Sequence, residues 1–225
     1  AHRVSPEWVY GFPEMTKGQA ELIKKAKRVA NPGCYPTGAI SLVRPLIENS
    51  IIPSSYPLTI NAVSGYSGGG KSLIKRFETK ENEAPPIYFY GTNLSHKHLP
   101  EMQQYIGLDN PPFFIPSVGK YMHGMIVQVP IYLTESLNTA IRPQTIHDVL
   151  SQHYDSSNFV TVNPLDTART PVEISPEKLN HSNMLEINVF SNNEETQCLL
   201  TATFDNLGKG ASRAAIQSME LMLDL

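Results

Sequence analysis

The sequence predicts an α+β domain built on a mixed, largely antiparallel sheet, with helical segments at both ends of the chain. The first observation is that segments rich in β-branched and aromatic residues crowd the second half, as is typical of strands. These segments cover residues 113–118, 125–133, 159–163, 184–190 and 198–204. The second is that only one helical pattern, at 144–154, interrupts them, so strands and helices do not alternate as in a parallel sheet.

Helices are predicted on either side of a turn near the start of the chain. Residues 16–28 carry good helix formers after a possible cap, Thr16. The apolar face of this helix is expected to consist of Leu22, Ile23 and Ala26. A turn at 31–33 leads into small and apolar residues at 37–50, which predict a second helix. Cys34 is therefore expected at or near the N-terminus of that helix.

The other elements follow from the same patterns. Residues 58–63 predict a strand that ends in a glycine-rich loop, and residues 72–79 predict a short helix. A last helix is predicted over 210–225. Its apolar face is expected to consist of Ala214, Ile216, Met219, Leu221, Met222 and Leu223.

Composition excludes several classes of partner. The 18 basic and 21 acidic residues give a net charge of -3 and form no block of like charge, so the sequence predicts binding to neither nucleic acid nor an anionic membrane. No apolar run approaches the roughly 20 residues that span a bilayer, and the first residues lack the zones of a signal peptide. A cytoplasmic protein is expected. Two cysteines in such different settings as Cys34 and Cys198 imply no disulfide framework.

The first candidate for chemistry is Cys34, in the segment PGCYPTG at 32–38. A helix N-terminus stabilises a thiolate and supplies N–H groups that can hold an oxyanion. The alternative is a small buried cysteine at a tight turn, which position alone does not exclude. Cys198 lies within an apolar strand, where a thiol packs as a small hydrophobic group.

The second candidate is the segment SHKHLPE at 95–101, because a thiol mechanism needs a proton acceptor and donor nearby. His96 and His98 would point to opposite sides of an extended segment, so one of them is expected to face the site. A metal site would have to recruit Cys34 and Glu101 as further ligands. A solvated loop without a role is the remaining alternative.

Two glycine-rich segments are the other candidates. Residues 65–72 match the P-loop pattern G-x-x-x-x-G-K-S after a strand, and Asp205 could serve as an acidic magnesium partner. The dense strands of the second half do not fit a P-loop enzyme, so we expect this loop to bind a phosphate or carboxylate. The turn at 205–212 either faces a cofactor or starts a helix capped by Asn206 or Ser212.

Six motifs follow one another along the chain: AHRVSPEWVYGFPE at 1–14, VANPGCYPTGAISLVRP at 29–45, NAVSGYSGGGK at 61–71, HKHLPEM at 96–102, VGKYMHGMIVQVP at 118–130 and DNLGKGAS at 205–212. Taken together and in this order, they resemble the short bacterial form of the N-acetyl-gamma-glutamyl-phosphate reductase family. The resemblance covers the chain from Ala1 to Leu225. It implies that Cys34 is the catalytic thiol.

The resemblance implies a fold like that of the glyceraldehyde-phosphate and aspartate-semialdehyde dehydrogenases. Residues 1–33 would be the remainder of a Rossmann NADP-binding domain, 34–206 a catalytic and oligomerisation domain, and 207–225 a C-terminal helix that returns to the first domain. No strand followed by G-x-G-x-x-G opens the chain, so a segment holding the pyrophosphate loop is expected before Ala1, and this chain alone should bind NADPH poorly. A homo-oligomer, dimer or tetramer, is implied through the sheet of the catalytic domain.

The implied reaction is NADPH-dependent reduction of an acyl phosphate to a semialdehyde through a Cys34 thioester, in arginine biosynthesis. His96 is the family-matched acid and base, with His98 as second choice. Substrate contacts are expected from Arg3, Ser64, Gly65, Ser67, Lys71 and His98. Cofactor contacts are expected from Gly33, Pro36, Asn206, Gly208 and Lys209, and no metal is expected.

This chain departs from the family pattern at Arg213, where a small residue is common, and at His123, where related forms carry glutamine or arginine. Other functions stay open at this point: a cysteine hydrolase or acyltransferase, a non-catalytic descendant, and a P-loop NTPase. A substrate one methylene longer, aminoadipyl instead of glutamyl, would be distinguished only by the shape of the pocket, worth about 1 to 3 kcal/mol.

Overall fold

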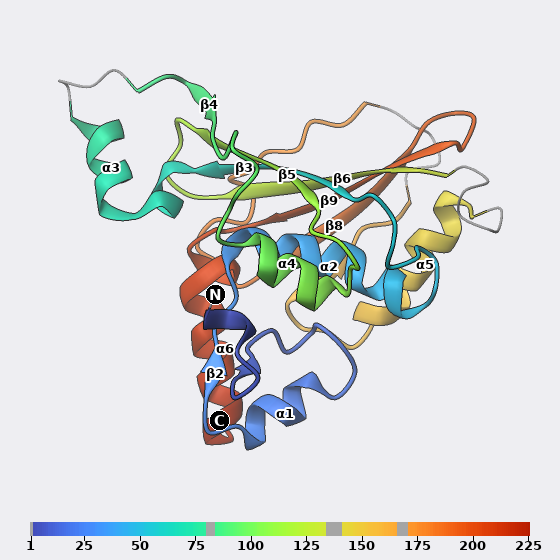
Figure 1. Cartoon of the computed structure of the whole chain (residues 1–225), viewed down its shortest axis with the longest axis horizontal. Helices are drawn as coiled ribbons and strands as arrows, with labels where there is room; N and C mark the ends of the chain where they lie inside the picture. Colours follow the sequence, from blue (N-terminus) through green and yellow to red (C-terminus); the bar gives the residue numbers. More distant parts are fainter. Residues whose placement is uncertain (1, 80–83, 134–140, 166–170) are drawn as a thin grey trace.

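The computed structural model describes residues 2–79, 84–133, 141–165 and 171–225. Among these residues, a seven-stranded sheet forms one layer and helices packed beneath it form a second (Figure 1). A smaller group of elements, at the bottom of Figure 1, contains both ends of the chain. No helix in the described ranges has the length and apolar character needed to cross a membrane. The cytoplasmic location stays a prediction.

The sheet has the strand order β4-β5-β3-β6-β9-β8-β7. Its strands are β3 (Thr59–Gly65), β4 (Ile87–Phe89), β5 (Phe113–Gly119), β6 (Met125–Tyr132), β7 (Val160–Val162), β8 (Leu185–Ser191) and β9 (Gln197–Phe204). The pairs β3/β5 and β7/β8 are parallel, and the other four pairings are antiparallel. The predicted mixed, largely antiparallel sheet is confirmed, whereas the short strand β4 was not predicted.

The buried layer of helices consists of α2 (Cys34–Glu48), α4 (Leu99–Ile106) and α5 (Pro143–Tyr154). The central helix, α2, is long, apolar and almost wholly buried. Pro45 within α2 has no N–H to donate to the Ser41 carbonyl, and the Tyr154 hydroxyl of α5 donates to that oxygen instead, at 2.9 Å. This bond satisfies a buried carbonyl and ties α5 to α2.

The smaller group holds β1 (Val9–Tyr10), α1 (Gln19–Lys25) and β2 (Val29–Ala30), with β1 and β2 paired in parallel. The predicted first helix is therefore shorter than 16–28. Thr16 does not cap it, because α1 begins after Gly18, which adopts a left-handed conformation with φ of 85°. Of the predicted apolar face, Ile23 is buried but Leu22 is 56% exposed.

The last helix, α6 (Arg213–Leu223), packs beside α1 and follows a π-helical turn, η3 (Gly208–Ser212). Its predicted apolar face is wrong, since Ala214 is buried together with the polar Gln217 and Ser218. Most of the larger apolar residues are exposed: Ile216, Met219, Met222 and Leu223. The inner face is polar because it meets a buried ion pair, described below.

The short helix α3 (Gly70–Glu78) projects from one end of the sheet and has no buried residue (Figure 1). It was predicted at 72–79. The helix α4 was not predicted, because the segment at 95–101 was interpreted as extended. Pro100 in the first turn of α4 is the local signal for that helix.

Candidate active site

A cavity of about 270 Å³ lies at the N-terminus of α2, where β3 and the segment before α4 also end. Of the predicted site residues, it brings together Cys34, Ser64, Gly65, His96 and His98. Residues that sequence reasoning did not single out complete the lining, among them Tyr35, Leu73, Tyr88, Tyr90 and Lys97. The cavity therefore joins motifs that lie far apart in the sequence.

Cys34 is the first residue of α2, as predicted. Burial raises the pKa of its thiol to about 11 and outweighs the lowering effects of the Tyr35 and Cys34 backbone N–H groups and of Arg3. The nearby Glu101 carboxylate adds to the rise. A helix N-terminus alone thus does not ionise this thiol, and a base must take its proton when it reacts.

Alkylation separates the two cysteines. Cys34 opens into the cavity, whereas Cys198 is 3% exposed in β9 and its pKa is raised by burial to about 12. Iodoacetamide should therefore modify Cys34 well before Cys198, at a rate that rises about tenfold per pH unit below pH 11, in step with the thiolate fraction. Mass spectrometry of the folded protein reads both sites, and equal labelling would show that Cys34 is not the accessible thiol.

Both histidines of the HKH segment line the cavity, so the predicted alternation on an extended segment is wrong. His98 immediately precedes α4, and its backbone N–H donates to His96 Nδ1 at 3.2 Å. In a neutral His96 ring the proton then lies on Nε2. His98 is 5% exposed, and burial lowers its pKa to about 3, which keeps its ring neutral near pH 7.

Gly33 allows the His98 ring to lie against the turn before Cys34. A Cβ atom at Gly33 would lie 2.7 Å from His98 Nε2 and 3.0 Å from Arg3 Nη1. A larger residue at position 33 would push the His98 ring and the Arg3 guanidinium away from the turn before Cys34. Within the described ranges, no hydrogen bond joins Cys34 Sγ to either imidazole, as is common before a substrate is bound.

Glu101 organises the turn before Cys34, a role that sequence reasoning missed. Its Oε1 accepts hydrogen bonds from the Gly33 N–H and the Tyr10 hydroxyl, both at 2.8 Å, and its Oε2 accepts from Arg3 Nη1 at 3.3 Å. Burial raises the pKa of this carboxyl, against the opposing effect of these three donors. Its spacing from His98, one helical turn along α4, would have been the signal.

The glycine-rich segment after β3 does not form a phosphate-binding P-loop. The N–H groups of Gly65, Tyr66 and Ser67 donate to carbonyls of residues 121–124. Ser67 Oγ is also engaged, since it donates to Met122 O and accepts from Asn206 Nδ2. Ser67 therefore holds two loops together, and the expected substrate contact from its side chain is not supported.

The positions of Lys71 and Asp205 do not fit a P-loop nucleotide-binding site either. Lys71 is exposed on α3, outside the cavity that holds Cys34. The Asp205 carboxylate is buried and accepts hydrogen bonds from the His181 and Leu207 N–H groups. The described residues include no group of three or more His, Cys, Asp or Glu that could hold a metal ion.

The expected cofactor contacts are buried or occupied by the protein. Asn206 is 1% exposed, accepts from the Gly124 N–H at 2.8 Å and donates to Ser67. Lys209 is fully buried and paired with Glu14, because it points into the smaller group of elements. Three others are packed: the Gly33 N–H is bound to Glu101, Pro36 is buried in α2, and a Cβ at Gly208 would strike Ser182 O at 2.3 Å. Ser212 occupies the N-cap position of α6, but its side chain makes no capping hydrogen bond and donates to Leu207 O instead.

Comparison with known proteins identifies the fold and the family of the chain. The family model of the semialdehyde dehydrogenase dimerisation domain matches residues 34–206. Among solved structures, aspartate semialdehyde dehydrogenase II from Vibrio cholerae aligns with a TM-score of 0.65 at 18% identity and covers 99% of this chain and 70% of that one. The enzyme from Francisella tularensis aligns with a TM-score of 0.64 at 11% identity, which shows a shared fold.

Closer relatives are named N-acetyl-gamma-glutamyl-phosphate reductase. The protein of that name from Burkholderia cenocepacia is 48% identical over 225 residues, covering 99% of this chain and 72% of the relative. The one from Rhizobium meliloti is 49% identical over 226 residues, with shares of 99% and 73%. At this identity and coverage, the chain belongs to the N-acetyl-gamma-glutamyl-phosphate reductase family.

Proposed function

We propose that this protein reduces N-acetyl-gamma-glutamyl phosphate to N-acetylglutamate semialdehyde and phosphate, with Cys34 carrying the acyl group as a thioester, in arginine biosynthesis. The observation that carries the proposal is the cavity in which Cys34, at a helix N-terminus, lies beside two histidines of lowered pKa. The names of the close relatives support the substrate.

Cys34, His98 and His96 have separate roles in the proposed reaction. Cys34 Sγ attacks the acyl carbon while His98 Nε2 takes the thiol proton, and the bond from carbon to the phosphate oxygen breaks, which releases phosphate. The Nε2–H of His96 donates a hydrogen bond to the oxyanion of the tetrahedral intermediate. The backbone N–H groups at the start of α2 donate to the same oxygen. After reduction, the carbon–sulfur bond breaks, the semialdehyde leaves and the thiol regains its proton.

NADP(H) would supply the hydride when bound. Asn31 fits its nicotinamide end, because Asn31 Oδ1 is buried without a hydrogen-bond partner while its Nδ2 donates to Ala211 O near Gly210 and Cys34. An amide N–H suits this acceptor. The Lys209 amino group is buried against Glu14 and is not available to the phosphates.

We propose the corresponding division of the chain. Residues 1–33 contribute to the NADP-binding domain, 34–206 form the catalytic and oligomerisation domain, and 207–225 return to the first part. The parallel pair β1/β2 with α1 between its strands supports the first assignment. The packing of α6 beside α1 supports the last.

The direct test is the reverse reaction. The intact protein is mixed with NADP⁺, phosphate and N-acetylglutamate semialdehyde, and NADPH is followed by its absorbance. Formation of NADPH that requires both phosphate and the semialdehyde is expected. Hydrolysis of an activated N-acetylglutamyl thioester without any nicotinamide turnover would instead identify a cysteine hydrolase.

We propose Arg3, at the turn before Cys34, as a cation that binds the substrate's phosphate or carboxylate, in addition to Lys97 in the lining of the cavity. Arg3 lies beside Gly33, keeps 41% of its side chain exposed and lowers the pKa of Cys34. Arg3→Met should raise KM for the acyl phosphate about 10- to 100-fold, as expected for a lost charge-assisted hydrogen bond. Lys71→Ala is the matched control and should change KM less than about twofold, the usual effect of a surface site. A larger effect for Lys71→Ala would restore the loop of residues 65–71 as the anion site.

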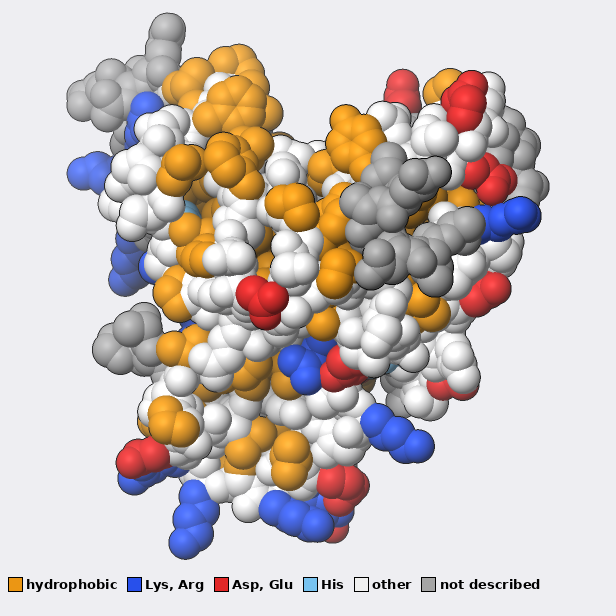
Figure 2. All heavy atoms as spheres, turned by 45° about the vertical axis from the view of Figure 1, so that its right-hand side comes forward, with side chains coloured by type: hydrophobic (Ala, Val, Ile, Leu, Met, Phe, Trp, Pro, Cys, Tyr) orange, Lys and Arg blue, Asp and Glu red, His pale blue; other side chains and the backbone are white. Residues whose placement is uncertain are grey.

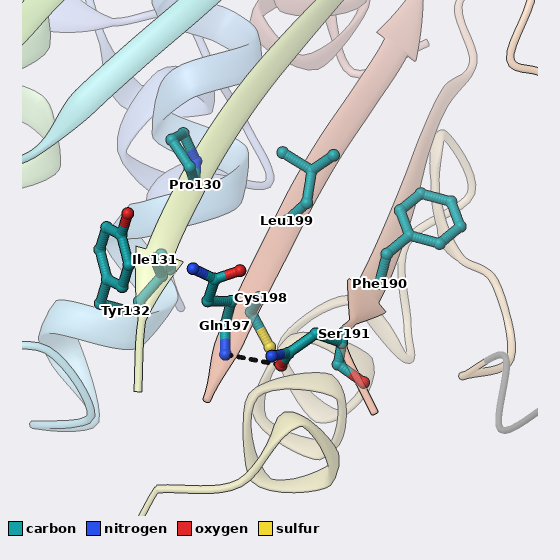
Figure 3. Close-up of a pocket in the computed structure, with 9 residues that line it drawn as sticks. Pro130, Ile131, Tyr132, Phe190, Ser191, Gln197, Cys198 and Leu199 are labelled. Carbon is teal, nitrogen blue, oxygen red and sulfur yellow. Dashed lines mark hydrogen bonds between the residues drawn. The ribbon is translucent and has the colours of Figure 1, made fainter. Parts of the chain in front are cut away.

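We also propose that copies of this chain form a homo-oligomer through the face of the sheet that the helices do not cover. Pro130, Leu199 and Phe190 pair side by side on β6, β9 and β8 (Figure 3). Leu199 is 37% exposed and Tyr132 59%, and Figure 2 shows hydrophobic side chains gathered in the upper half of the molecule. An apolar surface of this kind is typical of a subunit interface. The matching domain is described by its family model as a dimerisation domain.

Leu199→Asp tests this interface. A carboxylate buried between two copies would lose its hydration, so the variant should shift to the monomer in sedimentation or light scattering. Leu22→Asp on α1, which is 56% exposed, is the control and should leave the oligomer unchanged. An unchanged oligomer in Leu199→Asp would place the interface elsewhere.

A further inference from the structure

A buried ion pair joins the smaller group of elements to the turn before α6. Lys209 is 0% exposed, and its Nζ donates to Glu14 Oε1 at 2.8 Å and to Gln217 Oε1 at 2.9 Å. Gln217 Nε2 donates to the same Glu14 oxygen at 2.8 Å. The rings of Phe12 and Phe159 lie 5.5 and 5.3 Å from Lys209 Nζ, which places the ammonium within cation–π range of both.

This cluster gathers segments that are distant in the sequence. Glu14 lies in the loop before α1, and its backbone carbonyl accepts a hydrogen bond from His153 Nε2 of α5 at 3.0 Å. Gln217 belongs to α6 and also accepts from Asn183 Nδ2 at 3.0 Å. The proposed reaction assigns no step to Lys209. Burying its charged amino group carries a high desolvation cost, which calls for a structural reason.

The residue after Lys209 touches the nucleophile. A Cβ atom at Gly210 would lie 2.9 Å from Cys34 Cβ and 3.3 Å from Cys34 Cα, so the backbone of η3 packs directly against the first residue of α2. The Gly210 N–H donates to Asp205 O at 3.0 Å. One side of the Cys34 side chain is therefore bounded by a backbone whose position depends on where Lys209 is anchored.

We propose that Lys209 is a positioning residue for Cys34: its buried pair with Glu14 holds Gly210 against the nucleophile and so fixes the direction of the thiol in the cavity. The proposal rests on Cys34 being the nucleophile of the proposed function. A misplacement of about 1 Å in a reacting group can cost on the order of 100-fold in rate, so such an anchor has a catalytic effect without touching substrate.

The test removes both charges together. Lys209→Met alone leaves a buried carboxylate without its partner and can prevent folding, whereas Lys209→Met with Glu14→Gln replaces both groups by neutral ones of similar size. Lys24→Met with Asp224→Asn is the matched control, because it removes an exposed ion pair between α1 and the end of α6. Gly210→Ala, which adds a Cβ against Cys34, is the third variant.

Three measurements separate positioning from stability. For the Lys209/Glu14 variant we expect kcat to fall about 100-fold with KM nearly unchanged, and the pH profile of Cys34 alkylation to shift relative to the control. Combined with Gly210→Ala, the loss should be smaller than the product of the separate losses, since both changes act on one contact. An alkylation profile and a kcat equal to those of the control would overturn the proposal. Alkylation needs no turnover, so a parent protein without reductase activity would contradict the proposed function and leave this test intact.

Discussion

Cys34→Ser should abolish the reduction while the protein keeps its fold. The serine hydroxyl ionises far above the thiol that it replaces, so the transfer of its proton to His98 is much less favourable and the variant has no effective nucleophile near neutral pH. Loss of the nucleophile in covalent catalysis costs on the order of 10⁶-fold in kcat. Rapid-quench mass spectrometry should also show an acylated Cys34 in the parent protein and none in the variant.

The other cysteine provides the control. Cys198→Ser replaces a thiol that is 3% exposed in β9, away from the cavity of Cys34. We expect this variant to lose some stability, because a hydroxyl replaces a buried apolar group, but to retain kcat. Turnover by Cys34→Ser within a few fold of the parent would exclude the thioester mechanism, whatever the behaviour of Cys198→Ser.

His98→Asn should give the second largest effect, a fall in kcat of about 100- to 10,000-fold, because it removes the proton acceptor beside Cys34. This reverses the expectation from the sequence, which favoured His96. His98 Nε2 lies against Gly33, whereas His96 Nδ1 accepts the His98 N–H and leaves only Nε2 for the substrate. His96→Asn is the paired variant and should cost less. Kinetics in which only His96→Asn is crippled would return the acid and base role to that residue.

The pH profile gives an independent check on the same residue. The reactive form has a neutral His98 and a protonated thiol, whose pKa values are about 3 and about 11. Activity should be lost as the pH falls through the first value, where the imidazole takes a proton from solvent. Between about pH 4 and pH 10, kcat/KM should be nearly level in the parent protein. A steep limb near pH 6.5 would show that a histidine with an ordinary pKa controls the reaction.

The sequence alone determined the local features of this protein. Alternating and β-branched residues predicted the long strands β5, β6, β8 and β9, and helical spacing predicted α5 to within a residue. The turn with Gly33 and the small residues after it predicted that Cys34 begins a helix. These predictions succeed because periodicity and turn chemistry act between residues that are close in the chain.

The tertiary structure alone decided which of these features meet. Lys209 stands in a motif that suggested a cofactor contact, yet its amino group is paired with Glu14, almost the whole length of the chain away. Only one of His96 and His98 was expected to face the site, but both line the cavity, because the start of α4 turns His98 towards Gly33. Partner choice for a charged or titratable group depends on which distant segment excludes water from it. Which segment excludes the water depends on how the helices pack beneath the sheet, and this packing cannot be predicted from local periodicity.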